Sequence, residues 1–231
     1  EEGFRQLGIY GACVKIAMLL SLLTQAFRYA YEPIVFADKE AGRERTLADG
    51  MKWFVACSTI AYVAVVAGMP VLKHFVQPAY WEGLDVVPVV MLAEVFMGVY
   101  FNLSFWYKLS DRTWWGAVLS AIGSAVMIGV NVVFVPRFGY SACAWGGLLG
   151  YGTAMVLSFL IGRRRYPVHY DLKSILGSCL YGILSVIVLN LLDGWLKMAA
   201  GALLVLVFAG LLFLPSRLRG VPSEKQAGPL D

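Results

Sequence analysis

The sequence predicts an all-α, polytopic membrane protein: a helical bundle with about seven transmembrane helices. Of its 231 residues, 59% are hydrophobic and only 34 are charged (19 Lys and Arg, 15 Asp and Glu), whereas soluble domains are about 45–50% apolar and 25% charged. Apolar runs of about 20 residues recur along the chain, and each can cross a hydrocarbon core about 30 Å thick. The net charge of +4 is spread over short loops, which argues against a nucleic-acid partner and a secreted disulfide scaffold.

Seven apolar segments are expected to span the membrane. Pro136 is expected to end the fourth, because proline lacks an N–H, and residues 136–139 then turn the chain into an antiparallel hairpin. We divide the chain into a five-helix part (1–162), a last transmembrane hairpin (163–215) and a cytoplasmic tail (216–231). The expected spans are Leu7–Phe36, Trp53–Leu72, Val86–Tyr107, Thr113–Val135, Gly139–Gly162, Ile175–Leu192 and Trp195–Leu214.

The basic residues predict the orientation of these spans. Thirteen Lys and Arg lie on one side, in the connections 37–52, 108–112 and 163–173 and in the tail, against four on the other side. The positive-inside rule makes the richer side cytoplasmic, so the C-terminus is expected in the cytoplasm and Glu1 outside. We expect an odd number of further spans before Glu1 to deliver it there, and a matching seven would make this chain the second lobe of a fourteen-helix, two-lobed protein.

Charged and polar side chains inside the first span are the main candidates for a binding site. One stripe of polar side chains lies on a single helix face, because its members are separated by steps of 4, 3 and 4 residues. The stripe consists of Ser21, Gln25, Arg28 and Glu32. Lys15 lies about 80° from Gln25 and could face the same cavity across its width. Charges inside a bilayer are costly and usually face a bundle interior or water. The alternative for Arg28 and Glu32 is a simple i,i+4 pair near the interface.

Glu94 and Asn102 in the third span are candidates for ion coupling. Glu94 is expected near the middle of its helix, where an isolated carboxylate can change its protonation state. Asn102 follows about two turns further along. The alternative is that Glu94 is hydrogen-bonded to a neighbouring helix or paired with Lys15. We leave both alternatives open.

Nothing in the sequence indicates an enzyme. Spacings typical of metal ligands, phosphate-binding glycine loops or nucleophile elbows do not occur, and we expect no catalytic residue, metal or cofactor. The four cysteines fall in different spans and are expected to pack as small apolar residues. Gly146 and Gly150 are spaced i,i+4 in a segment rich in small residues, which predicts close helix packing.

Several segments, in the same order, resemble bacterial oligosaccharide-lipid flippases. These are the polysaccharide transporters of the multidrug/oligosaccharidyl-lipid/polysaccharide exporter superfamily. The likeness covers most of residues 1–165, and the segments that carry it are 7–17, 25–30, Glu32-Pro33, 80–83, Val87-Pro88 and 136–142.

The resemblance implies a transporter that moves undecaprenyl-diphosphate-linked sugar units across the bacterial inner membrane for lipopolysaccharide O-antigen or capsule. Transport would use alternating access, driven by an ion gradient as in an antiporter. The resemblance further implies that Lys15 and Arg28 stand where cavity cations of that family meet the diphosphate or acidic sugars. The partners would be the lipid-linked oligosaccharide, membrane lipids and an N-terminal lobe. The alternatives are a multidrug or peptidoglycan-precursor exporter of the same superfamily, a non-transporting scaffold, or a membrane-embedded sugar-modifying enzyme.

Overall fold

The computed structural model describes residues 2–218, and this part of the chain consists of helices joined by short connections, without a strand. It contains seven helices that are long and apolar enough to cross a membrane, over Gly3–Ala37, Gly42–Ala67, Pro78–Leu109, Trp114–Phe138, Tyr140–Arg165, Leu172–Asn190 and Gly194–Leu212. The predicted all-α polytopic bundle is therefore confirmed, and the protein is a multi-pass membrane protein.

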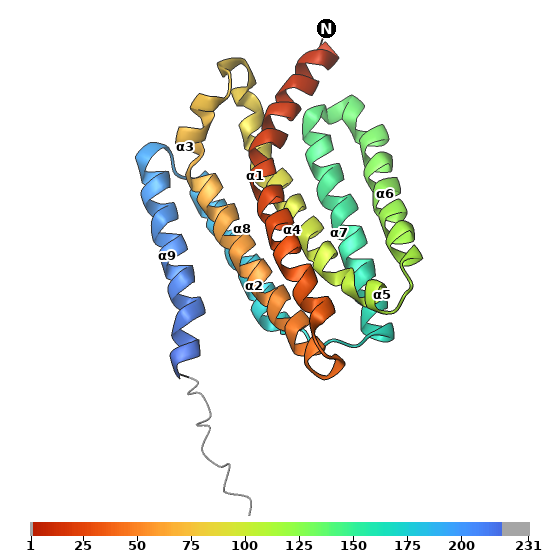
Figure 1. Cartoon of the computed structure of the whole chain (residues 1–231). Coiled ribbons are helices and arrows are strands. Elements are labelled where there is room, and N and C mark those ends of the chain that lie inside the picture. Colours follow the sequence, from red (N-terminus) through yellow and green to blue (C-terminus); the bar gives the residue numbers. More distant parts are fainter. Residues whose placement is uncertain (1, 219–231) are drawn as a thin grey trace, which may run out of the picture.

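The main helices form one bundle around α4 (Figure 1). Helix α4 packs on α1, α2 and α7; α6 covers α7, and both α8 and α9 pack on α2. The main helices are α1 (Glu2–Ala37), α2 (Glu40–Ala67), α4 (Val87–Leu103), α6 (Trp114–Phe138), α7 (Tyr140–Arg165), α8 (Leu172–Asn190) and α9 (Gly194–Leu218). Shorter elements are α3 (Met69–Leu72), η1 (Lys73–Phe75), η2 (Pro78–Val86) and α5 (Phe105–Leu109).

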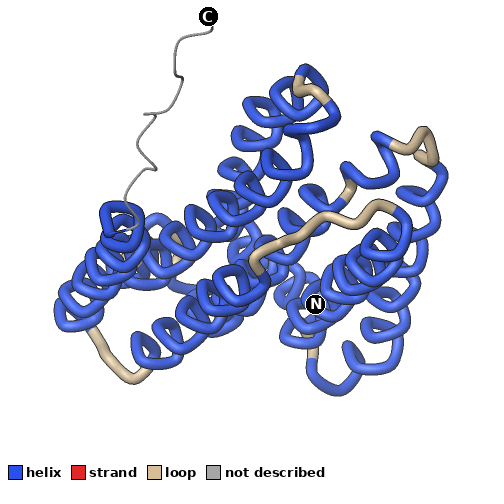
Figure 2. The backbone as a smooth tube through the Cα atoms, turned by 90° about the horizontal axis from the view of Figure 1, so that it is seen from below, coloured by secondary structure: helices blue, strands red, loops and turns tan. Residues whose placement is uncertain are grey.

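The two ends of the bundle differ in charge. We call the end at which α1 meets α2, α5 meets α6 and α7 meets α8 the basic end, because the connections predicted to hold most Lys and Arg lie there. Figure 2 views the bundle from this end. The connection 166–171 crosses it from α7 to α8 (Figures 1 and 2).

The core lies where the central helices meet. Leu20 of α1, Phe54 of α2 and Met91 of α4 are fully buried in one apolar cluster, which also includes Leu189 of α8. Many side chains of the outer helices are apolar and exposed, as expected where lipid rather than water is the solvent. Such helices associate through close packing rather than through a hydrophobic driving force.

Small residues join α6 and α7 closely, as predicted from Gly146 and Gly150. A Cβ atom at Gly150 would lie 2.8 Å from the Gly123 carbonyl oxygen of α6, and one at Gly146 would overlap Asn131 Oδ1. The two helices are connected by Gly139 alone, which has φ +57°. Glycine adopts this backbone conformation without steric cost.

The second predicted span has the wrong boundaries. Helix α2 begins at Glu40, so most of the expected loop 37–52 is helical, and α2 ends at Ala67 rather than at Leu72. The charges of its first turns do not stop the helix, because they lie at the basic end; the Arg45 side chain, for example, is 90% exposed and pairs with Asp49. Residues Met69–Leu72 form the separate short helix α3, with proline in its first turn.

Proline does not end α6 at the predicted place. Pro136 lies inside the last turn, and the helix continues to Phe138. Proline removes one backbone hydrogen bond and crowds the carbonyl of the preceding turn. Only two residues of α6 follow Pro136, so little of the helix is displaced by this break.

Pro215 likewise lies inside α9, which reaches Leu218 and so passes the predicted boundary. The third span also begins earlier than predicted, since η2 extends it back to Pro78. Most of the predicted cytoplasmic tail, residues 219–231, lies outside the described part of the chain.

The contact between α6 and α7 predicts a specific loss of stability. Gly150→Ala should lower the free energy of unfolding by about 1–3 kcal/mol, because the new Cβ would overlap a backbone oxygen of α6. Gly129→Ala is the matched control on α6, since a Cβ there would meet nothing within 4 Å. Denaturant titration of the purified protein in detergent measures both. Equal stability of the two variants would contradict the packing described here.

Candidate functional site

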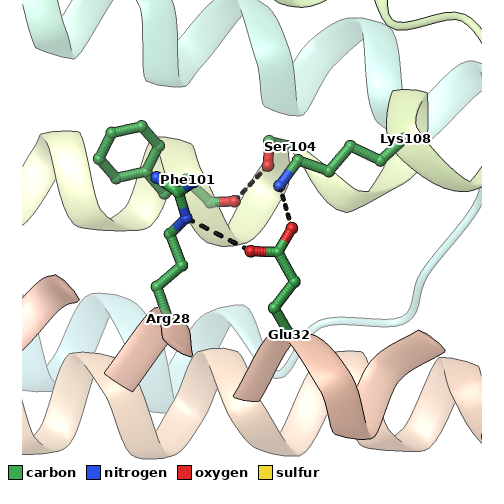
Figure 3. Close-up of polar contacts among 5 residues, drawn as sticks. All are labelled: Arg28, Glu32, Phe101, Ser104 and Lys108. Atoms are coloured by element: carbon green, nitrogen blue, oxygen red, sulfur yellow. Dashed lines mark hydrogen bonds and ion pairs between the residues drawn. The ribbon is translucent and has the colours of Figure 1, made fainter. Parts of the chain in front are cut away.

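Three charged side chains from two regions of the sequence meet near the basic end of α1 (Figure 3). Glu32 of α1 accepts a hydrogen bond of 2.7 Å from Lys108 Nζ of α5 through Oε1. Its other oxygen, Oε2, pairs with Arg28 Nε at 3.4 Å. One carboxylate is thus shared between two cations, so the cluster of Arg28, Glu32 and Lys108 carries a net charge of +1.

The Arg28 guanidinium is only partly engaged by this cluster. It lies 5.1 Å from the centre of the Phe101 ring of α4 (Figure 3), which favours a cation–π contact. Its ion pair uses Nε alone. Among the described residues no ion pair or hydrogen bond uses its two terminal nitrogens, and its side chain is 42% exposed. The two terminal nitrogens therefore offer a planar pair of hydrogen-bond donors to a ligand.

The structure does not bring Lys15 into this cluster. Thirteen residues separate it from Arg28, which is roughly 20 Å along the helix axis and about 140° around it. Lys15 is exposed and lines a different groove, about 610 Å³ in volume, between α1 and the segment 72–80 that includes η1. Gln25 is exposed as well. Of the four predicted binding residues, only Arg28 and Glu32 touch each other.

Glu94 and Asn102 occupy different environments on α4. Glu94 is half-buried and faces the Ser21 hydroxyl of α1, so the described structure pairs it with a neighbouring helix rather than with Lys15. Asn102 is buried, and its Nδ2 donates to the Gly98 carbonyl oxygen of its own helix at 3.1 Å. The two residues therefore do not form one polar site.

The apolar spans do not reveal the part played by Lys108 and Phe101. Lys108 counts only as a charge of the connection 108–112 when the third span is expected to end at Tyr107. In the sequence, Glu94, Phe101 and Lys108 follow one another at intervals of seven residues. Helix α5 continues almost directly from α4, so all three belong to one nearly continuous helix. A seven-residue repeat stays on nearly the same helix face, and this spacing was the available signal.

Removal of the shared carboxylate is predicted to destabilise the protein more than removal of a carboxylate from an exposed ion pair. Glu32→Gln should lower the free energy of unfolding by about 1–3 kcal/mol, because the amide keeps one acceptor oxygen but no charge, and its NH2 group replaces the oxygen that serves the second of the two partly buried cations. Asp49→Asn is the control: it breaks the exposed pair with Arg45 and should cost less than about 1 kcal/mol. Denaturant titration in detergent checks this, and equal losses in the two variants would count against the cluster.

Other polar side chains of the described residues form no metal site, since no three of their His, Cys, Asp and Glu side chains gather. His74 packs against the Trp81 ring, whereas His169 pairs with Glu44 near the basic end. Comparison of the chain with known proteins gave no match to a family model, a curated protein or a solved structure.

Proposed function

We propose that this chain is part of a membrane transporter that moves lipid-linked oligosaccharides, carried on undecaprenyl diphosphate, to the outer leaflet of a bacterial inner membrane. The observation that carries the proposal is the guanidinium of Arg28, which is held in a membrane-spanning helix with both terminal nitrogens unused by the described residues. The resemblance of residues 1–165 to oligosaccharide-lipid flippases supports the same substrate class.

The chemistry of the cluster suits a diphosphate. Arginine binds phosphate oxygens through two parallel hydrogen bonds, whereas lysine acts as a point charge. Glu32 compensates one of the two cations of the cluster, and its shorter contact is with Lys108. An anionic group that approaches the cluster therefore meets a net positive charge and the free side of Arg28.

The sign of the charge favours this substrate over a cationic drug. To bind a cation, the cluster itself would need an uncompensated carboxylate, but its one carboxylate, that of Glu32, already contacts two basic side chains. Lys15 adds a second cation on α1, in the groove beside the segment 72–80. Two basic positions at different depths of one helix suit a substrate whose phosphates cross the membrane.

The remaining parts of the proposal follow from the resemblance and from the distribution of charge. The basic end is placed in the cytoplasm, together with the C-terminus. The chain acts as one lobe beside a second lobe of seven helices, and the two lobes alternate in access. Glu94, which is half-buried between α4 and α1, couples transport to an ion gradient.

Replacement of Arg28 tests the proposed substrate site. Arg28→Gln should reduce transport about tenfold to hundredfold, because a hydrogen-bonded charged group contributes about 1.5–3 kcal/mol. The assay follows a fluorescent undecaprenyl-diphosphate oligosaccharide across proteoliposomes that contain the full-length protein. Arg45→Gln is the matched control, since the Arg45 side chain is 90% exposed on α2. Normal transport by Arg28→Gln, with normal protein content, would refute the site.

Replacement of Glu94 tests the coupling separately. Glu94→Gln keeps the shape of the side chain but cannot release a proton, so transport should no longer respond to an imposed pH or sodium gradient. Downhill exchange of the labelled lipid without a gradient should continue. Unchanged gradient dependence would assign Glu94 a structural role while leaving the Arg28 site untouched.

A further inference from the structure

A second groove lies between α7 and α8 at the basic end, apart from the cluster of Arg28, Glu32 and Lys108. Its volume is about 260 Å³, and the surface that lines it is apolar. Its floor is formed by the buried side chains Met51, Val99 and Leu103, whereas Val156 and Leu176 at its edges are exposed. The groove is therefore open on the outer surface of the bundle.

The packing of the helices explains this groove. Helix α8 packs on α2, whereas α7 packs on α4 and α6, so α7 and α8 do not follow one another as a close pair. The connection 166–171 bridges them, and Tyr170 lines the groove from this connection. An apolar groove that faces the membrane excludes water and suits a hydrocarbon chain.

Two basic side chains flank the groove where it reaches the basic end. Arg163 lies one helical turn beyond Phe159, which lines the groove, and positions i and i+4 share a helix face. Lys173 directly follows Leu172, another lining residue. Both side chains are exposed, and neither takes part in an ion pair between the described residues.

The acidic side chains nearby are already engaged. The carboxylate of Asp171 accepts a hydrogen bond of 3.2 Å from the Ser174 N–H at the start of α8. Glu44 of α2 is paired with His169 in the connection. Neither contact removes the charge of its carboxylate, but four exposed basic side chains lie at this end of α7 and α8 against these two carboxylates: Arg163, Arg164, Arg165 and Lys173. The groove is therefore apolar inside and predominantly positive at its rim.

We propose that this groove binds an anionic phospholipid, with one acyl chain in the apolar part and the phosphate held by Arg163 and Lys173. Basic pockets between membrane helices are suited to anionic headgroups. Arg163 contributes two parallel donors for phosphate oxygens. The site is separate from the Arg28 cluster, so it stands or falls independently of the proposed transport activity.

The charge of the rim is tested with the purified full chain and mixed micelles of phosphatidylglycerol and phosphatidylcholine. Native mass spectrometry measures the lipid that each variant retains. The double variant Arg163→Gln/Lys173→Gln should bind phosphatidylglycerol about 30-fold more weakly, because each basic residue beside an anionic headgroup contributes about 1 kcal/mol. The control Lys39→Gln/Arg45→Gln removes the same charge elsewhere at the basic end and should bind normally.

The apolar part of the groove is tested by filling it. Val156→Trp should displace the bound phosphatidylglycerol, whereas Leu184→Trp, at a similarly exposed position of α8 that does not line the groove, should not. Three results would overturn the proposal. The first is that the unmodified chain retains phosphatidylcholine as well as phosphatidylglycerol. The second is that both charge variants lose the same amount of bound phosphatidylglycerol. The third is that equimolar undecaprenyl diphosphate displaces phosphatidylglycerol, which would make the groove a substrate site.

Discussion

A charged side chain in a membrane-spanning helix must be solvated by protein, water or lipid headgroups, and this constraint shapes α1 and everything around it. Glu32 satisfies it by binding Arg28 and Lys108 together. The pairing ties the basic end of α1 to α5, and α5 continues α4, the helix around which the bundle is built. The charge that makes α1 costly in lipid thus also helps to fix its position, together with the packing of its buried apolar residues on α4.

The fold class and the number of spans could be read from the sequence, because apolar length alone decides whether a helix can cross a bilayer. The ends of the helices could not. Charges predict the end of a span, but a helix continues into water when its charges lie at the surface, as α2 does from Glu40. Proline predicts the end of a helix, yet Pro136 lies within the last turn of α6.

The candidate site was only half predictable, for a related reason. Helical spacing placed Arg28 and Glu32 on one face of α1, and they do form a pair. Lys108 is 76 residues away from Glu32, and only the packing of α1 beside α4 and α5 brings it there. Spacing alone also grouped Lys15 with the stripe, whereas the helical rotation leaves it in a separate groove beside the segment 72–80.

The single residue between α6 and α7 has a mechanical consequence. Two helices joined by one glycine cannot separate at that end without unwinding, and their backbones already touch at Gly123 and Gly150. Helices α6 and α7 must therefore turn or tilt together as one rigid body during any rearrangement of the bundle. Because α7 also packs on α4, such a tilt would be transmitted directly to the helix that carries Glu94 and Phe101.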